Sequence, residues 1–176
     1  EGILKGDLIV KGGADPLLTS EGLWQIAADL SHLGLRRVTG QLVIDAKPVS
    51  LPYRNARGAH AYDAELSTMG VNFNTLVVAV APGLKPGDPV IVSLDPYPLQ
   101  GVKLTSSATT GRDDGGTVLA VDVSGNAKSG IRAVVRGKMP LGTPLRKFYR
   151  SVTDAPYLAG LYLRAFLNAQ GVTIKG

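Results

Sequence analysis

One polar segment of the chain carries the side-chain types of a nucleophilic triad, His60, Asp63 and Ser67. In such a triad the imidazole takes the proton of the serine hydroxyl, and the carboxylate orients the imidazole. The three groups must lie close together in the folded protein. Their closeness within one segment of the sequence is not evidence that they do. The chain also lacks a Gly-x-Ser-x-Gly segment that would present a serine nucleophile. We therefore interpret these three residues as ordinary loop residues.

A second serine stands among residues that imitate a catalytic pattern. Ser124-Gly125-Asn126 and Lys128-Ser129-Gly130 match Ser-x-Asn and Lys-Ser/Thr-Gly, two of the three motifs of serine enzymes that react with penicillin. The third motif, Ser-x-x-Lys, supplies the nucleophile, and no serine of this chain has lysine three positions further on. Apolar, strand-like residues on both sides predict that Ser124 to Gly130 form a turn between two strands. We predict that none of these residues is catalytic.

The glycine-rich segment Lys11-Gly12-Gly13-Ala14-Asp15 lies between a predicted strand and a predicted helix, where phosphate-binding loops occur. It matches neither the Gly-x4-Gly-Lys-Ser/Thr nor the Gly-x-Gly-x-x-Gly pattern, and Pro16 removes an amide donor. We interpret it as a structural turn. The chain has no cysteine and two histidines, which leaves little for a metal site. The sequence therefore predicts no catalytic, cofactor-binding or metal-binding residue, and no cofactor.

Positive charge is concentrated in the second half of the chain. In total, 19 Lys and Arg residues stand against 14 Asp and Glu residues. Seven basic residues and no acidic one lie between Val123 and Thr153: Lys128, Arg132, Arg136, Lys138, Arg146, Lys147 and Arg150. Arg132, Arg136 and Lys138 fall on one face of a predicted strand, whose other face carries Ile131, Ala133 and Val135. This pattern is typical of the solvated face of a half-buried sheet. The alternative is a contact surface for an anionic polymer; scarce aromatics and short basic runs argue against nucleic acid.

The elements at the two ends of the chain follow one pattern. Residues 3–11 and 38–44 read as strands. Between them a helix is predicted with Ser20 as its N-cap, an apolar stripe (Leu23, Ile26, Ala27, Leu30 and Leu33) and Gly34 as its end. Near the C-terminus a second stripe (Leu158, Leu161, Tyr162, Ala165, Phe166 and Ala169) is followed by Gly171 and the strand 172–174. We interpret the two helix–glycine–strand units as parts of one α/β layer.

The middle of the chain has a different character. Strand-like segments at 73–81, 89–94, 102–106, 117–123 and 130–137 are separated by turn residues, a spacing that favours a small antiparallel β-domain. With 44% hydrophobic residues the chain has enough apolar side chains for a core, and no apolar run is long enough to span a membrane. The predicted fold is α+β or α/β, with a discontinuous α/β domain (1–81 and 146–176) and a nested β-rich domain (82–145).

Several segments resemble a known family in the right order along the chain. Residues 6–19, GDLIVKGGADPLLT, resemble the segment GDL-apolar-apolar-x-GGGDP-x-L of the class C low-molecular-mass penicillin-binding proteins, the D-alanyl-D-alanine carboxypeptidase/endopeptidases of bacterial cell walls. Further matching segments are 23–34, VTG (38–40), ID (44–45), STMGVNFN (67–74), VAPG (80–83), VTDAP (152–156) and the end of the last helix with GVTIKG (171–176). Ala14 departs from the pattern, where a glycine is usual, and residues 46–58 lack the expected aromatic-rich match.

The resemblance implies a region without catalytic residues. In that family two accessory domains, one nested in the other, are inserted between the Ser-x-x-Lys and Ser-x-Asn motifs of the catalytic domain. The chain, which begins at Glu1 without Met and stops directly after a predicted strand, is similar to that insert. The expected partners are the catalytic domain of the same parent chain and peptidoglycan, in a periplasmic or exported setting. The resemblance implies a non-catalytic accessory region, inactive by itself; the alternative is a stand-alone binding or scaffold module for an anionic cell-wall polymer.

Overall fold

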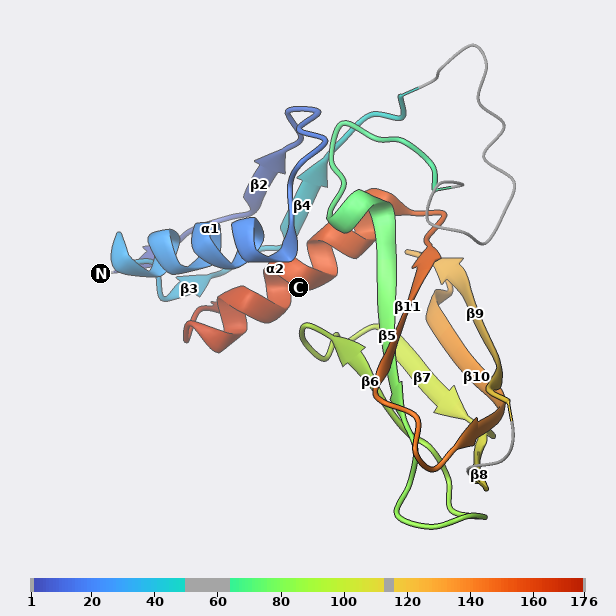
Figure 1. Cartoon of the computed structure of the whole chain (residues 1–176). Helices are drawn as coiled ribbons and strands as arrows, with labels where there is room; N and C mark the ends of the chain where they lie inside the picture. Colours follow the sequence, from blue (N-terminus) through green and yellow to red (C-terminus); the bar gives the residue numbers. More distant parts are fainter. Residues whose placement is uncertain (1, 50–63, 113–115, 176) are drawn as a thin grey trace.

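The computed structural model describes residues 2–49, 64–112 and 116–175. Two helices and short parallel strands form one part of the molecule, and longer strands in two sheets form the other (Figure 1). The helices are α1 (Ser20–His32) and α2 (Ala155–Ala169). The strands are β1 (Ile3–Leu4), β2 (Leu8–Lys11), β3 (Arg37–Val38), β4 (Leu42–Asp45), β5 (Thr75–Ala81), β6 (Ile91–Asp95), β7 (Val102–Ser106), β8 (Thr109–Gly111), β9 (Val118–Asn126), β10 (Gly130–Pro140), β11 (Arg146–Ser151) and β12 (Thr173–Ile174). The predicted α+β fold class is confirmed.

Helix α1 begins one residue earlier than the predicted cap implies. The side chain of Thr19, not that of Ser20, accepts a hydrogen bond from the amide of Gly22, at 3.4 Å. Ser20 is instead the first residue of the helix, and its amide donates to the side-chain oxygen of Asn72, at 2.9 Å. At the other end Gly34 has φ +97°, so the left-handed residue predicted there is confirmed.

The buried face of α1 also differs from the predicted stripe. Leu23 and Ala27 are fully buried, but Ile26 is 40% exposed and Leu33 is 85% exposed. Ala28, Ser20 and Ser31 complete the buried face, and the hydroxyl of Ser31 donates to the carbonyl oxygen of Gln170 beyond α2. The buried face is thus rotated toward these serines relative to the predicted stripe, and α1 packs against α2. In α2 a wider face is buried, with Tyr162 as its largest side chain.

The two helix–glycine–strand units meet in one layer, as predicted. β3 pairs in parallel with both β1 and β12, and Arg37 is opposite Ile3 on one side and Thr173 on the other. Residues 3–11 do not form one strand, because the chain turns at Gly6 (φ +100°) between β1 and β2. β2 then pairs in parallel with β4, which packs on α2 where Gly160 leaves space for Ile44.

The β-rich part is not purely antiparallel, which corrects the expectation for this region. β5 pairs antiparallel with β6 and β11, and β9 pairs antiparallel with β10. Along the opposite edge of β10, however, β7 and β8 lie end to end, and both pair in parallel with β10. In both pairings the residue of β10 has a number 29 higher than that of its partner. Alternation along a strand indicates which residues face the core, but it does not identify the neighbouring strand or its direction. The two sheets pack together, and Arg150 of β11 donates to the carbonyl oxygen of Val121 in β9 at 2.7 Å.

One sheet crosses the predicted domain boundaries. β5 ends at Ala81, and β11 begins at Arg146, so both strands lie outside the predicted insert 82–145. Both nevertheless belong to the sheet that contains β6, which lies inside it. Buried side chains also form one cluster that includes Leu23 of α1 and Val135 of β10. The division into two domains stays a prediction. No helix among the described residues is long and apolar enough to cross a membrane.

Candidate functional site

The residues that imitate a penicillin-reactive site lie at the hairpin of β9 and β10, but the turn is shorter than predicted. Ser124, Gly125 and Asn126 belong to β9 and Gly130 begins β10, so that residues 127–129 form the turn. The side-chain oxygen of Asn126 accepts hydrogen bonds from the amides of Lys128 (2.9 Å) and Ser129 (3.3 Å). This side chain therefore closes the turn and does not face a substrate. Ser124 and Lys128 are exposed to solvent. The turn offers neither an enclosed pocket nor a buried base beside the serine.

In the triad-like segment and in the glycine-rich loop, polar groups form hydrogen bonds within the protein. The hydroxyl of Ser67 donates to the carbonyl oxygen of Lys47 (3.2 Å) and accepts from the amide of Met69 (3.3 Å). His60 and Asp63 lie outside the described residues. In the glycine-rich loop, the amides of Gly12 and Ala14 donate to the carbonyl oxygens of Asp45 (2.9 Å) and Thr68 (2.7 Å), respectively. Because these amides are used inside the protein, the loop acts as a structural turn and not as a phosphate cradle.

Three consecutive residues with left-handed backbone, which sequence reasoning missed, lie beside this loop. Asn72, Phe73 and Asn74 have φ of 50°, 56° and 58°. Such residues cost roughly 1–2 kcal/mol each and persist only where surrounding contacts hold them. The amide of Asn72 donates to the carbonyl oxygen of Leu18 (3.0 Å), and the side chain of Asn74 donates to the carbonyl oxygen of Glu65. The two asparagines were the available signal, since Asn adopts this conformation more readily than most residues.

A groove of about 530 Å³ lies between the glycine-rich loop and the left-handed segment 72–74. Phe73, which is 68% exposed, lies at the side of this groove. Its lining includes Pro16, Leu18, Leu66 and Gly70 and is mainly apolar. The groove is bordered by Val49 and Ala64, which flank residues outside the described part of the chain. We assign no chemistry to it, because among its described lining residues no nucleophile and base face each other.

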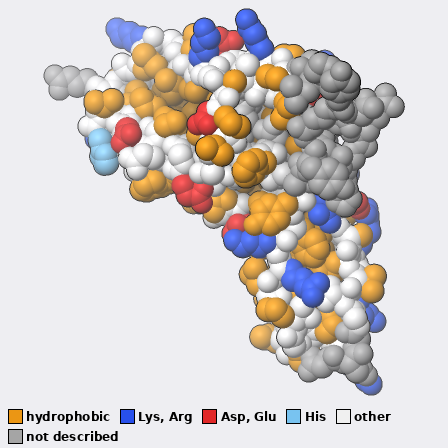
Figure 2. All heavy atoms as spheres, turned by 45° about the horizontal axis from the view of Figure 1, so that its top comes forward, with side chains coloured by type: hydrophobic (Ala, Val, Ile, Leu, Met, Phe, Trp, Pro, Cys, Tyr) orange, Lys and Arg blue, Asp and Glu red, His pale blue; other side chains and the backbone are white. Residues whose placement is uncertain are grey.

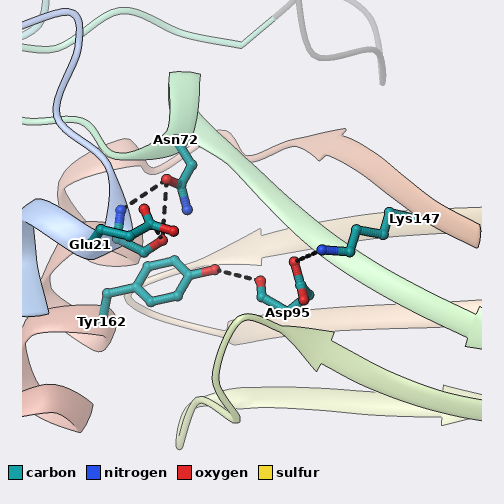
Figure 3. Close-up of polar contacts among 6 residues, drawn as sticks. Glu21, Asn72, Asp95, Lys147 and Tyr162 are labelled. Atoms are coloured by element: carbon teal, nitrogen blue, oxygen red, sulfur yellow. Dashed lines mark hydrogen bonds and ion pairs between the residues drawn. The ribbon is translucent and has the colours of Figure 1, made fainter.

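Polar side chains meet where the helices join the sheets (Figure 3). The hydroxyl of Tyr162 in α2 donates to the backbone carbonyl oxygen of Asp95 in β6, at 3.3 Å. Burial raises the pKa of Tyr162 to about 12, so the phenol stays protonated at neutral pH and cannot act as a base. Beside it, the carboxylate of Asp95 pairs with Lys147 at 2.9 Å and raises the lysine pKa.

On the α1 side of this junction, the side-chain oxygen of Asn72 accepts from the amide of Ser20 (Figure 3). The backbone amide of Glu21, followed by the side chain of Thr19, lowers the pKa of the Glu21 carboxyl. An acidic group in the first turn also stabilises the helix through its interaction with the positive end of the dipole. The junction therefore joins α1, α2, β6 and β11 structurally, and its groups are already paired with one another.

The charged face predicted on β10 is present. Ile131, Ala133 and Val135 are buried, whereas Arg132, Arg136 and Lys138 are exposed. Arg136 pairs with Asp122 of β9 at 2.8 Å, and both side chains are largely exposed. Lys and Arg side chains are spread over the β-rich part in the view of Figure 2. Among the described residues, no group of three or more His, Cys, Asp or Glu side chains is placed to hold a metal ion.

Comparisons with known proteins agree on one family. All 176 residues match the D-Ala-D-Ala carboxypeptidase 3 (S13) family. The chain is 30% identical to a D-alanyl-D-alanine carboxypeptidase from Actinomadura sp. (strain R39), over 97% of this chain and 33% of that protein. It thus spans about a third of the length of this curated relative.

Solved structures of penicillin-binding protein 4 from Haemophilus influenzae have the same fold. One matches 99% of this chain and 39% of its own length, with a TM-score of 0.68 and 20% identity. A second, in complex with a β-lactam, matches 100% of this chain and 37% of its own length, with a TM-score of 0.61 and 20% identity. Because the family match extends from the first residue to the last, the chain belongs to the D-Ala-D-Ala carboxypeptidase 3 (S13) family.

Proposed function

We propose that this chain is a non-catalytic accessory region of a D-alanyl-D-alanine carboxypeptidase/endopeptidase that acts on peptidoglycan. The observation that carries the proposal is a family match over the whole chain in a sequence without any Ser-x-x-Lys. The matched relative is three times as long, which leaves room for a catalytic domain elsewhere in such a protein. Its partners are then the catalytic domain of the parent chain and peptidoglycan, and its setting is periplasmic or exported.

The parent reaction would be acyl transfer. A serine of the catalytic domain attacks the carbonyl carbon between the two D-alanines, the terminal D-alanine leaves, and water hydrolyses the acyl-enzyme. No residue of this chain is given a role in these steps. Its contribution would be to hold a fixed shape beside the catalytic domain. The paired groups at the junction of Tyr162, Asp95 and Lys147 support this role, because they fix the helices against the sheets.

A second candidate function is a stand-alone binding or scaffold module for an anionic cell-wall polymer. The exposed cationic face of β10 favours this candidate. The two functions differ in what surrounds the chain. The first requires a coding sequence with Ser-x-x-Lys before Glu1 and with Ser-x-Asn and Lys-Thr-Gly after Gly176, whereas the second requires none of these motifs.

The natural coding sequence on both sides of the segment is therefore the first measurement. If the three motifs are present, the longer polypeptide should be labelled by a fluorescent penicillin, and the label should be lost when the Ser-x-x-Lys serine is changed to Ala. Motifs that are absent on both sides, or a longer polypeptide without labelling, would contradict the accessory role and favour the stand-alone module.

A further inference from the structure

Three strands place Lys103, Arg132 and Ser124 in one row across the outward face of a sheet. Arg132 in β10 is directly opposite Lys103 in β7 on one side and Ser124 in β9 on the other. All three residues are exposed, and the neighbouring Ile131 and Ala133 are buried on the inward face. We call Lys103, Arg132 and Ser124 the cationic row. Sequence reasoning identified Arg132 but not Lys103, because the parallel pairing of β7 with β10 could not be read from the chain.

The cationic row places two like charges side by side. Neighbouring strands are about 4.8 Å apart, and like charges directly opposite each other destabilise a sheet. Arg136, four residues further along β10 on the same face, has its acidic partner in Asp122. Lys103 and Arg132 have no ion-pair partner among the described residues. An anion bound between these two side chains would remove the repulsion, so the row is complementary to a carboxylate or phosphate group.

The surroundings of the row suit an extended ligand. The face continues along β10 from Arg132 to Arg136, a distance of about 13 Å at about 3.3 Å per residue. The outward residues of β9 and β7 along this stretch are small or polar: Ala120, Asp122, Ser124 and Thr105. Val134, between the two arginines, is only partly exposed. A polymer strand could therefore lie along this face and present an anionic group at the cationic row.

We propose that the cationic row binds peptidoglycan through the free carboxylates of its stem peptides. The inference rests on the proposed function, because the D-Ala-D-Ala unit that names the family ends in a carboxylate. The planar guanidinium of Arg132 can donate two parallel hydrogen bonds to a carboxylate, the ammonium of Lys103 adds a second charge, and the hydroxyl of Ser124 adds a donor. The ligand is thus held at a surface that contains no catalytic group.

Cosedimentation with purified peptidoglycan sacculi tests the proposal. The sacculi are first freed of phosphate-bearing polymers, and the sedimented fraction of the chain is measured against their concentration. The variant Lys103→Ala/Arg132→Ala should lower the apparent affinity about tenfold, because two exposed charge contacts are lost. The matched control is Lys5→Ala/Arg37→Ala, which removes the same charge from two exposed positions on the other part of the molecule. The control should bind as the unchanged chain does.

Two further measurements test whether the bound group is a carboxylate and whether the two side chains serve binding and not the fold. Amidation of the stem carboxylates with carbodiimide and glycinamide should lower binding of the unchanged chain to the level of the Lys103/Arg132 variant. Thermal unfolding should show that this variant is at least as stable as the unchanged chain, since a repulsive pair has been removed. A loss of stability would mean that the two side chains serve the fold and would overturn the proposal.

The remaining outcomes also decide the matter. Binding that requires phosphate-bearing wall polymers, or that survives amidation and is displaced by polyphosphate, would assign the row to phosphate and overturn the carboxylate proposal. Equal losses in both double variants, or no sedimentation at all, would overturn it as well. None of these results bears on the motifs that flank the segment in its gene, so the accessory role could stand while this inference fails.

Discussion

The hydroxyl of Tyr162 donates a hydrogen bond to the backbone carbonyl oxygen of Asp95, at 3.3 Å, and so joins helix α2 to the end of strand β6. Tyr162 is fully buried, and its ring also stacks with Phe166, at 5.9 Å between ring centroids. The side chain of Asp95 points the other way, to Lys147 (Figure 3). One residue of β6 therefore contacts α2 through its backbone and β11 through its carboxylate.

The first prediction concerns the pH dependence of stability that Tyr162 causes. The folded-state pKa of about 12 lies above the ordinary value of 10.0, so the folded chain holds this proton more tightly than the unfolded chain. The resulting stabilisation is fully present below pH 10 and is lost as the pH rises through 12, by about 2–3 kcal/mol in total. Tyr162→Phe should be less stable by about 1 kcal/mol at pH 8, because the hydrogen bond is lost. Urea unfolding at pH 8 and at several values up to pH 12 should show a steeper decline for the unchanged chain. Parallel declines in the two proteins would contradict the burial of the phenol.

A second prediction separates two adjacent glycines. A methyl group on Gly12 would overlap the carbonyl oxygen of Thr68, whereas one on Gly13 would meet nothing within 4 Å. Gly12→Ala should therefore lower the free energy of unfolding by about 2–3 kcal/mol, since backbone must shift to accommodate it. Gly13→Ala, the matched control, should change it by less than about 0.5 kcal/mol. Denaturant unfolding of both variants measures the difference, and equal values would show that the loop does not pack against Thr68 in this way.

The third prediction uses the departure of Ala14 from the family pattern. Ala14 has φ +59°, a left-handed conformation in which a Cβ atom is unfavourable and glycine is not. Ala14→Gly should raise the free energy of unfolding by about 0.5–1 kcal/mol, after the greater flexibility of glycine in the unfolded chain is taken into account. Ala127→Gly is the control, because Ala127 is exposed in the β9–β10 turn and is not among the residues with positive φ. That variant should be slightly less stable than the unchanged chain. The same sign of change in both variants would count against strain at Ala14.

How far the sequence predicts this structure depends on the range of the interactions involved. Gly34 and Gly171, which end the two helices, were predictable because helix termination depends on a few adjacent residues. The inward face of β10 was predictable for the same reason, since it alternates along one strand. The hydrogen bond between the amide of Ser20 and the side chain of Asn72 was not, because it joins residues far apart in the chain.

The pairing of strands was the least predictable feature. β7 and β8 follow β6 in the chain, yet they pair in parallel with β10 and not with one another. The cationic row consequently depends on the pairing of Lys103 with Arg132, which are 29 positions apart in the chain. The residues around each of them in the sequence do not indicate this pairing. The absence of Ser-x-x-Lys, by contrast, could be read directly from the chain because that motif is local.

The last prediction is that this polypeptide by itself forms no covalent adduct with a β-lactam. Acylation requires a serine beside a base that can take its proton, together with hydrogen-bond donors directed at the developing oxyanion. Ser124 comes nearest to this arrangement, but its neighbour Asn126 is committed to the amides of Lys128 and Ser129. Lys128 is exposed to solvent and is not enclosed beside the Ser124 hydroxyl. Incubation with a labelled penicillin, followed by intact-mass measurement, should show the unmodified mass. A stoichiometric increase that disappears in Ser124→Ala would place an active site at Ser124 in β9, and an increase that persists in this variant would place one at another nucleophile of the chain.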